Sequence, residues 1–184
     1  MSTNRLVTRP QQRPDSIDEI LNTLKRYDAS VIKDLEDYLQ DQYTTGFSDV
    51  SANLALLKLY ELSDESSVER EDSTIKVLIK GLTAYDDQDF TLYLHLLPSF
   101  VLSVKTDYTT KIQQLVSLYE LLAANKLDAF LAKNKEFDSI VDESNVKSIQ
   151  ETFNNNKDAK FIIRDVATED VPTSKLSKII GQKI

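Results

Sequence analysis

The sequence has 184 residues, of which 41% are hydrophobic and 28% charged, and its formal net charge is −8. It contains no cysteine, which excludes disulfides, thiolate zinc sites and cysteine hydrolases, and its negative charge opposes nonspecific binding to nucleic acid, which depends on Lys and Arg. Three glycines and four prolines leave few turn signals for a chain of many short strands, so an all-α fold is predicted.

No stretch of the sequence predicts a membrane span. The longest nearly apolar run, residues 92–102, is interrupted by His95 and Pro98 and is far shorter than the ~20 residues that a spanning helix needs. The amino terminus lacks the apolar core of a secretory signal. We therefore expect a soluble, cytoplasmic protein.

Residues 1–14 are predicted to form a flexible basic arm. They contain Arg5, Arg9 and Arg13, no acidic residue and mostly polar neighbours, so they bury too little apolar surface to repay the entropy of ordering. The alternative is that the arm lies on an acidic face of the same protein or of a partner.

Two amphipathic helices are predicted next. Ser16 and Glu19 have the S-x-x-E spacing of a capping box, which predicts a helix that begins at Ser16. A second helix, over residues 30–43, has apolar residues on one side and charged residues on the other. Gly46 is expected to end this segment.

Residues 49–62 predict the most deeply buried helix. Eight of the twelve residues from 51 to 62 are apolar, so this helix requires neighbours on nearly every side. Ser48 or Asp49 is expected to accept hydrogen bonds from its first free amides. The charged residues 63–72 that follow predict a solvent-exposed loop.

Helical patterns continue over residues 73–85, 90–104, 108–124 and 127–132. Pro98 predicts a kink or break just before it, because proline removes an amide donor. The apolar helices recur every 17 to 22 residues, which favours a right-handed helical-repeat stack of the TPR or HEAT kind, with a compact bundle as the alternative. The predicted core consists of Leu54, Leu57, Leu59, Tyr60, Leu78, Leu82, Phe90, Leu92, Leu118 and Leu122.

No catalytic, cofactor or metal site is predicted. His95 is the only histidine, and its apolar neighbours favour a hydrogen-bonded core imidazole over catalysis. Asp86, Asp87 and Asp89 lack the D-x-D-x-D-G pattern of a calcium loop and are expected to cap a helix instead. We therefore predict that the chain is not an enzyme.

Six short segments, in order, resemble the k subunit of eukaryotic translation initiation factor 3. The most specific are A-N-L-A-L-L-K-L-Y at residues 52–60 and D-F-T-L at residues 89–92. The others are R-Y at 26–27, L-E-D-Y at 35–38, L-I-K-G-L-T at 78–83, and L-Y-E-L-L at 118–122 with D-A-F at 128–130. Leu131 departs from the family, which tends to have an aromatic residue there.

The resemblance covers residues 16–133 and implies the PCI architecture, a helical-repeat domain followed by a winged helix. On this basis we expect a helical-repeat domain over residues 15–133 and an incomplete winged-helix-like region over residues 134–184. Within the latter, Asn154–Asn156 predicts a loop, and residues 160–167 and 173–180 predict two short helices. Residues 161–166 and 172–181 resemble the opening helices of a winged helix.

The function that the resemblance implies is that of a non-catalytic scaffold in the initiation factor. The implied partners are other subunits of the factor, especially the l subunit, and the small ribosomal subunit through the complex, without direct sequence-specific nucleic-acid binding. Two alternatives remain open: a PCI-like subunit of a proteasome-lid or signalosome-type assembly, and a free-standing acidic helical-repeat module that binds basic peptides.

Overall fold

The computed structural model describes residues 9–63, 67–98, 101 and 105–157, and every regular element in these ranges is helical, which confirms the all-α prediction for them. The α-helices are α1 (Asp15–Asn22), α2 (Ile32–Thr45), α3 (Val50–Leu62), α4 (Val68–Thr83), α5 (Asp89–His95), α6 (Asp107–Ala123), α7 (Leu127–Glu136) and α8 (Glu143–Lys157). Short 3-10 helices are η1 (Leu24–Tyr27), η2 (Ala29–Val31) and η3 (Tyr85–Asp87).

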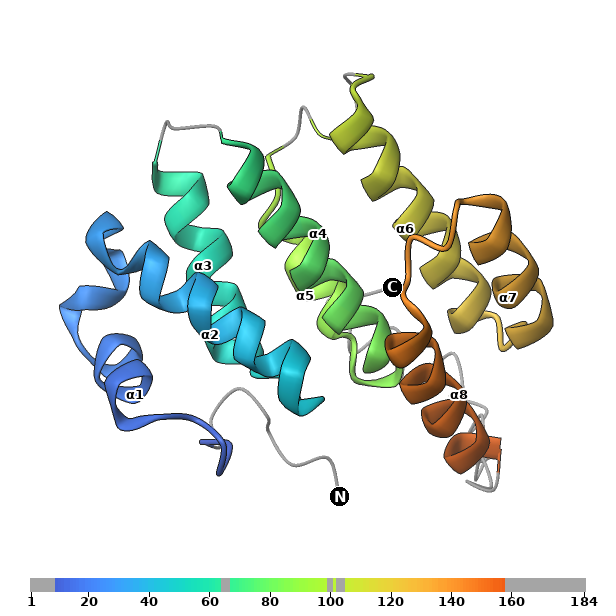
Figure 1. Ribbon diagram of the computed structural model, residues 1–184, viewed down its shortest axis with the longest axis horizontal. Helices are drawn as coiled ribbons and strands as arrows, with labels where there is room; N and C mark the ends of the chain where they lie inside the picture. The colour runs from blue at the N-terminus through green and yellow to red at the C-terminus, as the bar shows by residue number, and fades with distance from the viewer. Residues whose placement is uncertain (1–8, 64–66, 99–100, 102–104, 158–184) are drawn as a thin grey trace, which may run out of the picture.

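The helices form a row that runs from α1 at one end to α7 at the other (Figure 1). Helix α4 is the centre of this row, because it packs against α2, α3, α5, α6 and α8. Helix α3, which the sequence predicts to be the most deeply buried helix, packs against α1, α2, α4 and α5. The central position thus belongs to α4, although α3 has neighbours on several sides as predicted.

Local signals set the ends of α2, α3 and α5. Gly46 follows α2 in the left-handed conformation, with φ of 76°, and its amide donates to the Gln42 carbonyl at 3.1 Å. Asp49 caps α3 by accepting a hydrogen bond from the Ala52 amide at 3.3 Å. Helix α5 ends at His95, before Pro98, as the proline predicts.

One continuous apolar core connects α1 with α8. Eight of the predicted core residues are at most 4% exposed: Leu57, Leu59, Tyr60, Leu78, Leu82, Phe90, Leu118 and Leu122. Leu54 packs against this core while partly exposed. Leu92 differs, since it is 38% exposed. In the short helix α5, Phe90 and Tyr93 point inward three residues apart, and Leu92 therefore faces outward.

Two predicted helix starts are wrong. Helix α1 begins at Asp15, directly after Pro14, so Ser16 lies inside the first turn and does not cap the helix. Helix α4 begins at Val68, and the Ser67 hydroxyl caps it by accepting from the Arg70 amide at 3.2 Å. Residues 68–72 are therefore the charged first turns of an amphipathic helix and not part of a loop.

The Asn154–Asn156 segment is helical, because it lies within α8 and not in a loop. Ile149 and Phe153, one turn apart on α8, join the same core as α4, and the Thr152 hydroxyl donates to the Thr83 carbonyl at 3.3 Å. The helices predicted over residues 160–167 and 173–180 lie outside the described residues.

Candidate interaction surfaces

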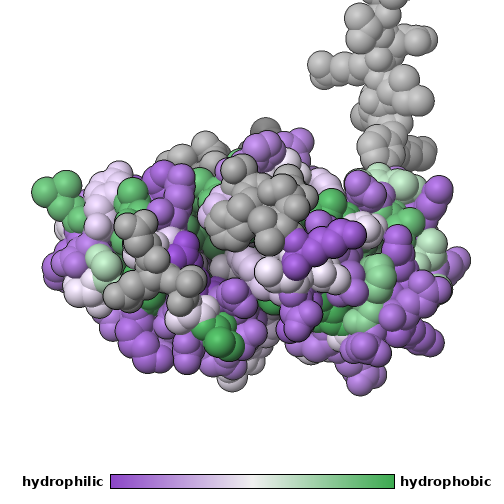
Figure 2. Space-filling model, turned by 90° about the horizontal axis from the view of Figure 1, so that it is seen from above, coloured by the Kyte–Doolittle hydropathy of each residue, from purple (hydrophilic) through white to green (hydrophobic). Residues whose placement is uncertain are grey.

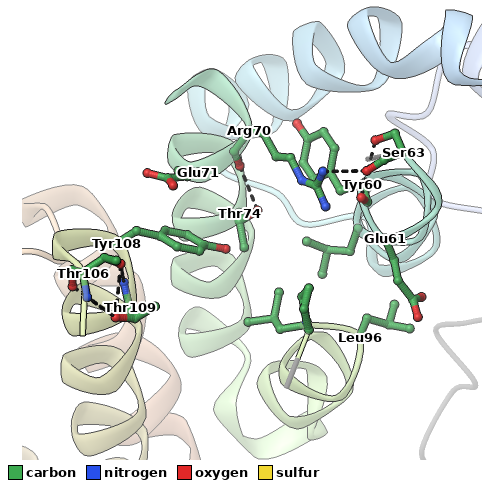
Figure 3. A pocket seen from close by; sticks show the side chains of 13 residues that line it. Tyr60, Glu61, Ser63, Arg70, Glu71, Thr74, Leu96, Thr106, Tyr108 and Thr109 are labelled. Carbon is green, nitrogen blue, oxygen red and sulfur yellow. Dashed lines mark hydrogen bonds between the residues drawn. The ribbon is translucent and has the colours of Figure 1, made fainter. Parts of the chain in front are cut away.

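A cleft of about 430 Å³ opens near the middle of the row, between the end of α3, the start of α4, residues 96–98 that follow α5, and the start of α6 (Figure 3). Leu57, Leu96, Leu97 and Pro98 supply apolar walls, and Tyr108 of α6 closes one side. Thr74, Thr106 and Thr109 add hydroxyl groups. This combination suits the binding of an apolar side chain with a few polar contacts at its edge.

Arg70 is held firmly at the mouth of this cleft. Its Nη1 donates to the Ser63 carbonyl at 2.9 Å, and its guanidinium lies 5.2 Å from the centre of the Tyr60 ring. The Tyr60 hydroxyl donates to Glu36, and burial raises the Tyr60 pKa, so this phenol stays a donor. The cleft therefore has a preformed cationic edge with Glu61 and Glu71 beside it.

The second feature is a buried ion pair between the N-terminal segment and α3. Arg13, which is 7% exposed, donates to Asp49 from Nε at 2.7 Å and from Nη2 at 2.8 Å, and Asp49 is 1% exposed. The Nη1 of Arg13 donates to Asp18 at 3.0 Å, and the Tyr38 hydroxyl donates to Asp49 at 3.0 Å. These carboxylates raise the pKa of Arg13, which keeps it charged.

The structure thus differs from a flexible arm over residues 9–14. Arg9 also pairs with Asp15, at 2.5 Å, and with Asp18, at 3.5 Å. The basic residues pair with acids of the same chain, which is the alternative that the charge pattern left open. Arg5 lies outside the described residues.

A third buried polar group is Lys80 of α4, which is 3% exposed. Its Nζ donates to the Gln42 carbonyl at 3.0 Å and lies 4.4 Å from the centre of the Tyr43 ring. Burial lowers the pKa of Lys80, and the nearby Asp142 opposes this shift. The contact links α4 to the end of α2. A lysine within an apolar helical stripe is the only sequence signal for it.

His95 is exposed, so the predicted core imidazole is wrong. Its Nδ1 lies 2.7 Å from the Thr91 carbonyl at the exposed end of α5, and it therefore donates to that oxygen. The helix cap predicted from the acidic residues before α5 also differs from the cap in the structure. Gln88 occupies the position before α5 in the left-handed conformation without a side-chain cap, while Asp89 lies in the first helical turn and is 3% exposed.

The described residues contain neither a metal-binding cluster nor a membrane-spanning helix. Among them, no three His, Cys, Asp or Glu side chains lie close enough together to hold a metal ion. In the same part of the chain, no helix is long and apolar enough to cross a membrane.

No protein-family model matches the sequence. Among curated proteins, the chain is similar to "Eukaryotic translation initiation factor 3 subunit K" of Yarrowia lipolytica, with 37% identity over 139 residues that cover 74% of this chain and 59% of that protein. The protein of the same name from Pyricularia oryzae is 32% identical over 133 residues, which cover 72% of this chain and 56% of that protein. That of Phaeosphaeria nodorum is 40% identical over 92 residues, covering 50% and 37%. The chain thus spans between 37% and 59% of the length of these curated relatives.

Proposed function

We propose, from its confirmed resemblance to subunit K of eukaryotic translation initiation factor 3, that this chain is a non-catalytic scaffold subunit of that factor in the cytoplasm. The observation that carries the proposal is the 37% identity over 139 residues with the Yarrowia lipolytica protein of that name. Its proposed partners are the other subunits, especially the l subunit, and through them the small ribosomal subunit.

The architecture supports a scaffold role because stacked helices present exposed side chains on a firm core. Among the described residues, the apolar side chains with the highest exposed fractions lie at helix ends, away from the buried faces of α3 and α4. They are Leu24 at 85%, Val68 at 71%, Tyr27 at 58% and Leu62 at 57% exposure. Seen from above, the molecule has a mostly polar surface with separate apolar patches (Figure 2). Leu24 and Tyr27 belong to the same short helix η1, so together they offer an apolar contact to a partner.

The test is co-purification of the tagged full chain from native extract of its source organism. We expect the other subunits of the initiation factor, the l subunit among them, to be recovered in stoichiometric amounts. A Leu24→Ser/Tyr27→Ser variant tests the exposed η1 residues, and Leu92→Ser on α5 is the matched control. Recovery of proteasome-lid or signalosome subunits instead of the initiation factor would refute the proposal.

A further inference from the structure

We propose that a groove between α4, α6 and the α7–α8 turn binds a basic segment of a partner protein, in which Lys or Arg flanks a large apolar side chain. The groove has a volume of about 530 Å³. It shares no lining residue with the cleft of Figure 3, and the inference does not rest on the resemblance to the initiation factor. Its floor is apolar, and its rim carries three aspartates and one lysine beside two neutral polar residues.

The floor provides the contact for an apolar side chain. Ile75 of α4 is 9% exposed, and Phe137 and Ile140 of the α7–α8 turn are partly buried against the core. Outside the lining of the groove, the Lys133 Nζ lies 5.7 Å from the centre of the Phe137 ring. A Leu or Phe side chain of the partner would bury further apolar surface on this floor, which favours binding.

The turn that forms one wall of the groove is held in a fixed shape. Asp138 and Ser139 both adopt positive φ, at 51° and 56°, a conformation that persists only when its surroundings hold it. Buried Asn134 provides this restraint: its Nδ2 donates to the Val141 carbonyl at 2.9 Å, and its Oδ1 accepts from the Val141 amide at 3.1 Å. The Ser139 amide also donates to the Asn134 carbonyl at 2.8 Å. The wall is therefore preformed, which lowers the entropic cost of binding.

The charges of the rim determine the chemistry of the partner. Asp72, Asp107 and Asp138 are exposed, and within the described ranges none of the three forms an ion pair. Lys111 is the only basic residue among the described side chains that line the groove. Asp107 lies in the first turn of α6, where the helix dipole favours a negative charge, whereas Asp72 lies beyond the first turn of α4. A negative rim above an apolar floor selects a positively charged segment and repels an acidic one.

The test uses a phage library of random 12-residue peptides, panned against the immobilised full chain, followed by fluorescence anisotropy with the enriched peptides. We expect them to carry Lys or Arg beside Leu, Ile or Phe. Asp72→Asn/Asp138→Asn should weaken their binding at least fivefold, because it removes two negative charges from the rim. Asparagine tolerates the positive φ at position 138, so the turn should keep its shape. The control Asp41→Asn/Glu120→Gln makes the same change of charge at exposed acids outside the groove and should alter binding by less than twofold.

A further variant, Phe137→Ala, tests the floor and should weaken binding while the thermal unfolding of the chain stays cooperative. The inference is refuted if the enriched peptides are acidic or neutral, if none is enriched, or if the rim variant binds as tightly as the unaltered chain. An equal loss of binding in the rim variant and the control pair would also refute it, because it would show that only overall charge matters. None of these results depends on whether the chain joins the initiation factor.

Discussion

Replacing Arg13 by methionine is expected to destabilise the fold far more than a change at any exposed arginine. The variant Arg13→Met keeps the aliphatic length of the side chain but leaves Asp49, which is 1% exposed, without its two guanidinium contacts. Removing one partner of a buried ion pair typically costs 3–5 kcal/mol. Asp49 keeps the Tyr38 hydroxyl and the Ala52 amide as donors, so we expect a loss of about 3 kcal/mol, at the lower end of that range.

Urea unfolding of the full chain, followed by circular dichroism, measures this loss. With a slope of about 2 kcal/mol per molar urea, the midpoint should fall by roughly 1.5 M. Arg9→Met is the matched control, because Arg9 is 44% exposed and pairs with Asp15, which is 96% exposed. Its midpoint should stay close to that of the unaltered chain, since exposed ion pairs contribute little.

A double-mutant cycle separates the ion pair from the loss of packing. Asp49→Asn retains a good helix cap for α3 and an acceptor for the Tyr38 hydroxyl. The combination Arg13→Met/Asp49→Asn should therefore be less destabilising than the sum of the two single changes, by about 2 kcal/mol. Strict additivity, or a single Arg13→Met variant as stable as the control, would refute a stabilising buried pair.

Three further predictions concern the core. Gly81→Ala should cost about 2 kcal/mol in the same urea assay, because the new Cβ would lie 2.8 Å from the Phe90 Cα, which cannot move like a flexible side chain. Leu57→Asp should abolish the cooperative transition and the dispersed amide spectrum, since it places an unpaired charge at a site that is 2% exposed; a soluble, cooperative variant would contradict this. Burial raises the pKa values of four tyrosines, Tyr38, Tyr43, Tyr60 and Tyr108, above their unfolded value of about 10. The stability from these neutral phenols is therefore present below that pH and is lost as pH rises through the raised pKa values, so phenolate absorbance should increase together with unfolding. Full ionisation of these tyrosines in the native fold would contradict this prediction.

The features predicted correctly from the sequence depend on neighbouring residues along the chain. Asp49 caps α3, Gly46 ends α2 and Pro98 follows the end of α5, each through backbone chemistry that acts within a few residues. Several wrong predictions concern helix boundaries, but the burial predicted for Leu92 and His95 depends on tertiary position. Leu92 and His95 belong to a strongly apolar stretch, but α5 is short and turns them toward solvent, which no local pattern indicates.

The candidate surfaces show the same division. The residues that line the α4–α6 groove can be read from the sequence, but their proximity cannot. Asp72, Asp107 and Asp138 are far apart along the chain, and only the packing of α4, α6 and α7 brings them to one rim. Their acidity was predictable as part of a net charge of −8. Their arrangement around an apolar floor was not.

The polar residues inside this core suggest how a helical stack keeps one geometry. Apolar packing alone tolerates small shifts of one helix along another, whereas a buried hydrogen bond with a defined partner does not. Lys80 ties α4 to the end of α2, Gln42 bonds with Asn53 of α3, and Arg13 bonds with Asp49. All of these contacts join α2, α3, α4 and the N-terminal segment, so this half of the row is the more narrowly specified. These bonds do not involve α6 or α7, so surface changes on those two helices should alter partner binding without shifting α2, α3 and α4.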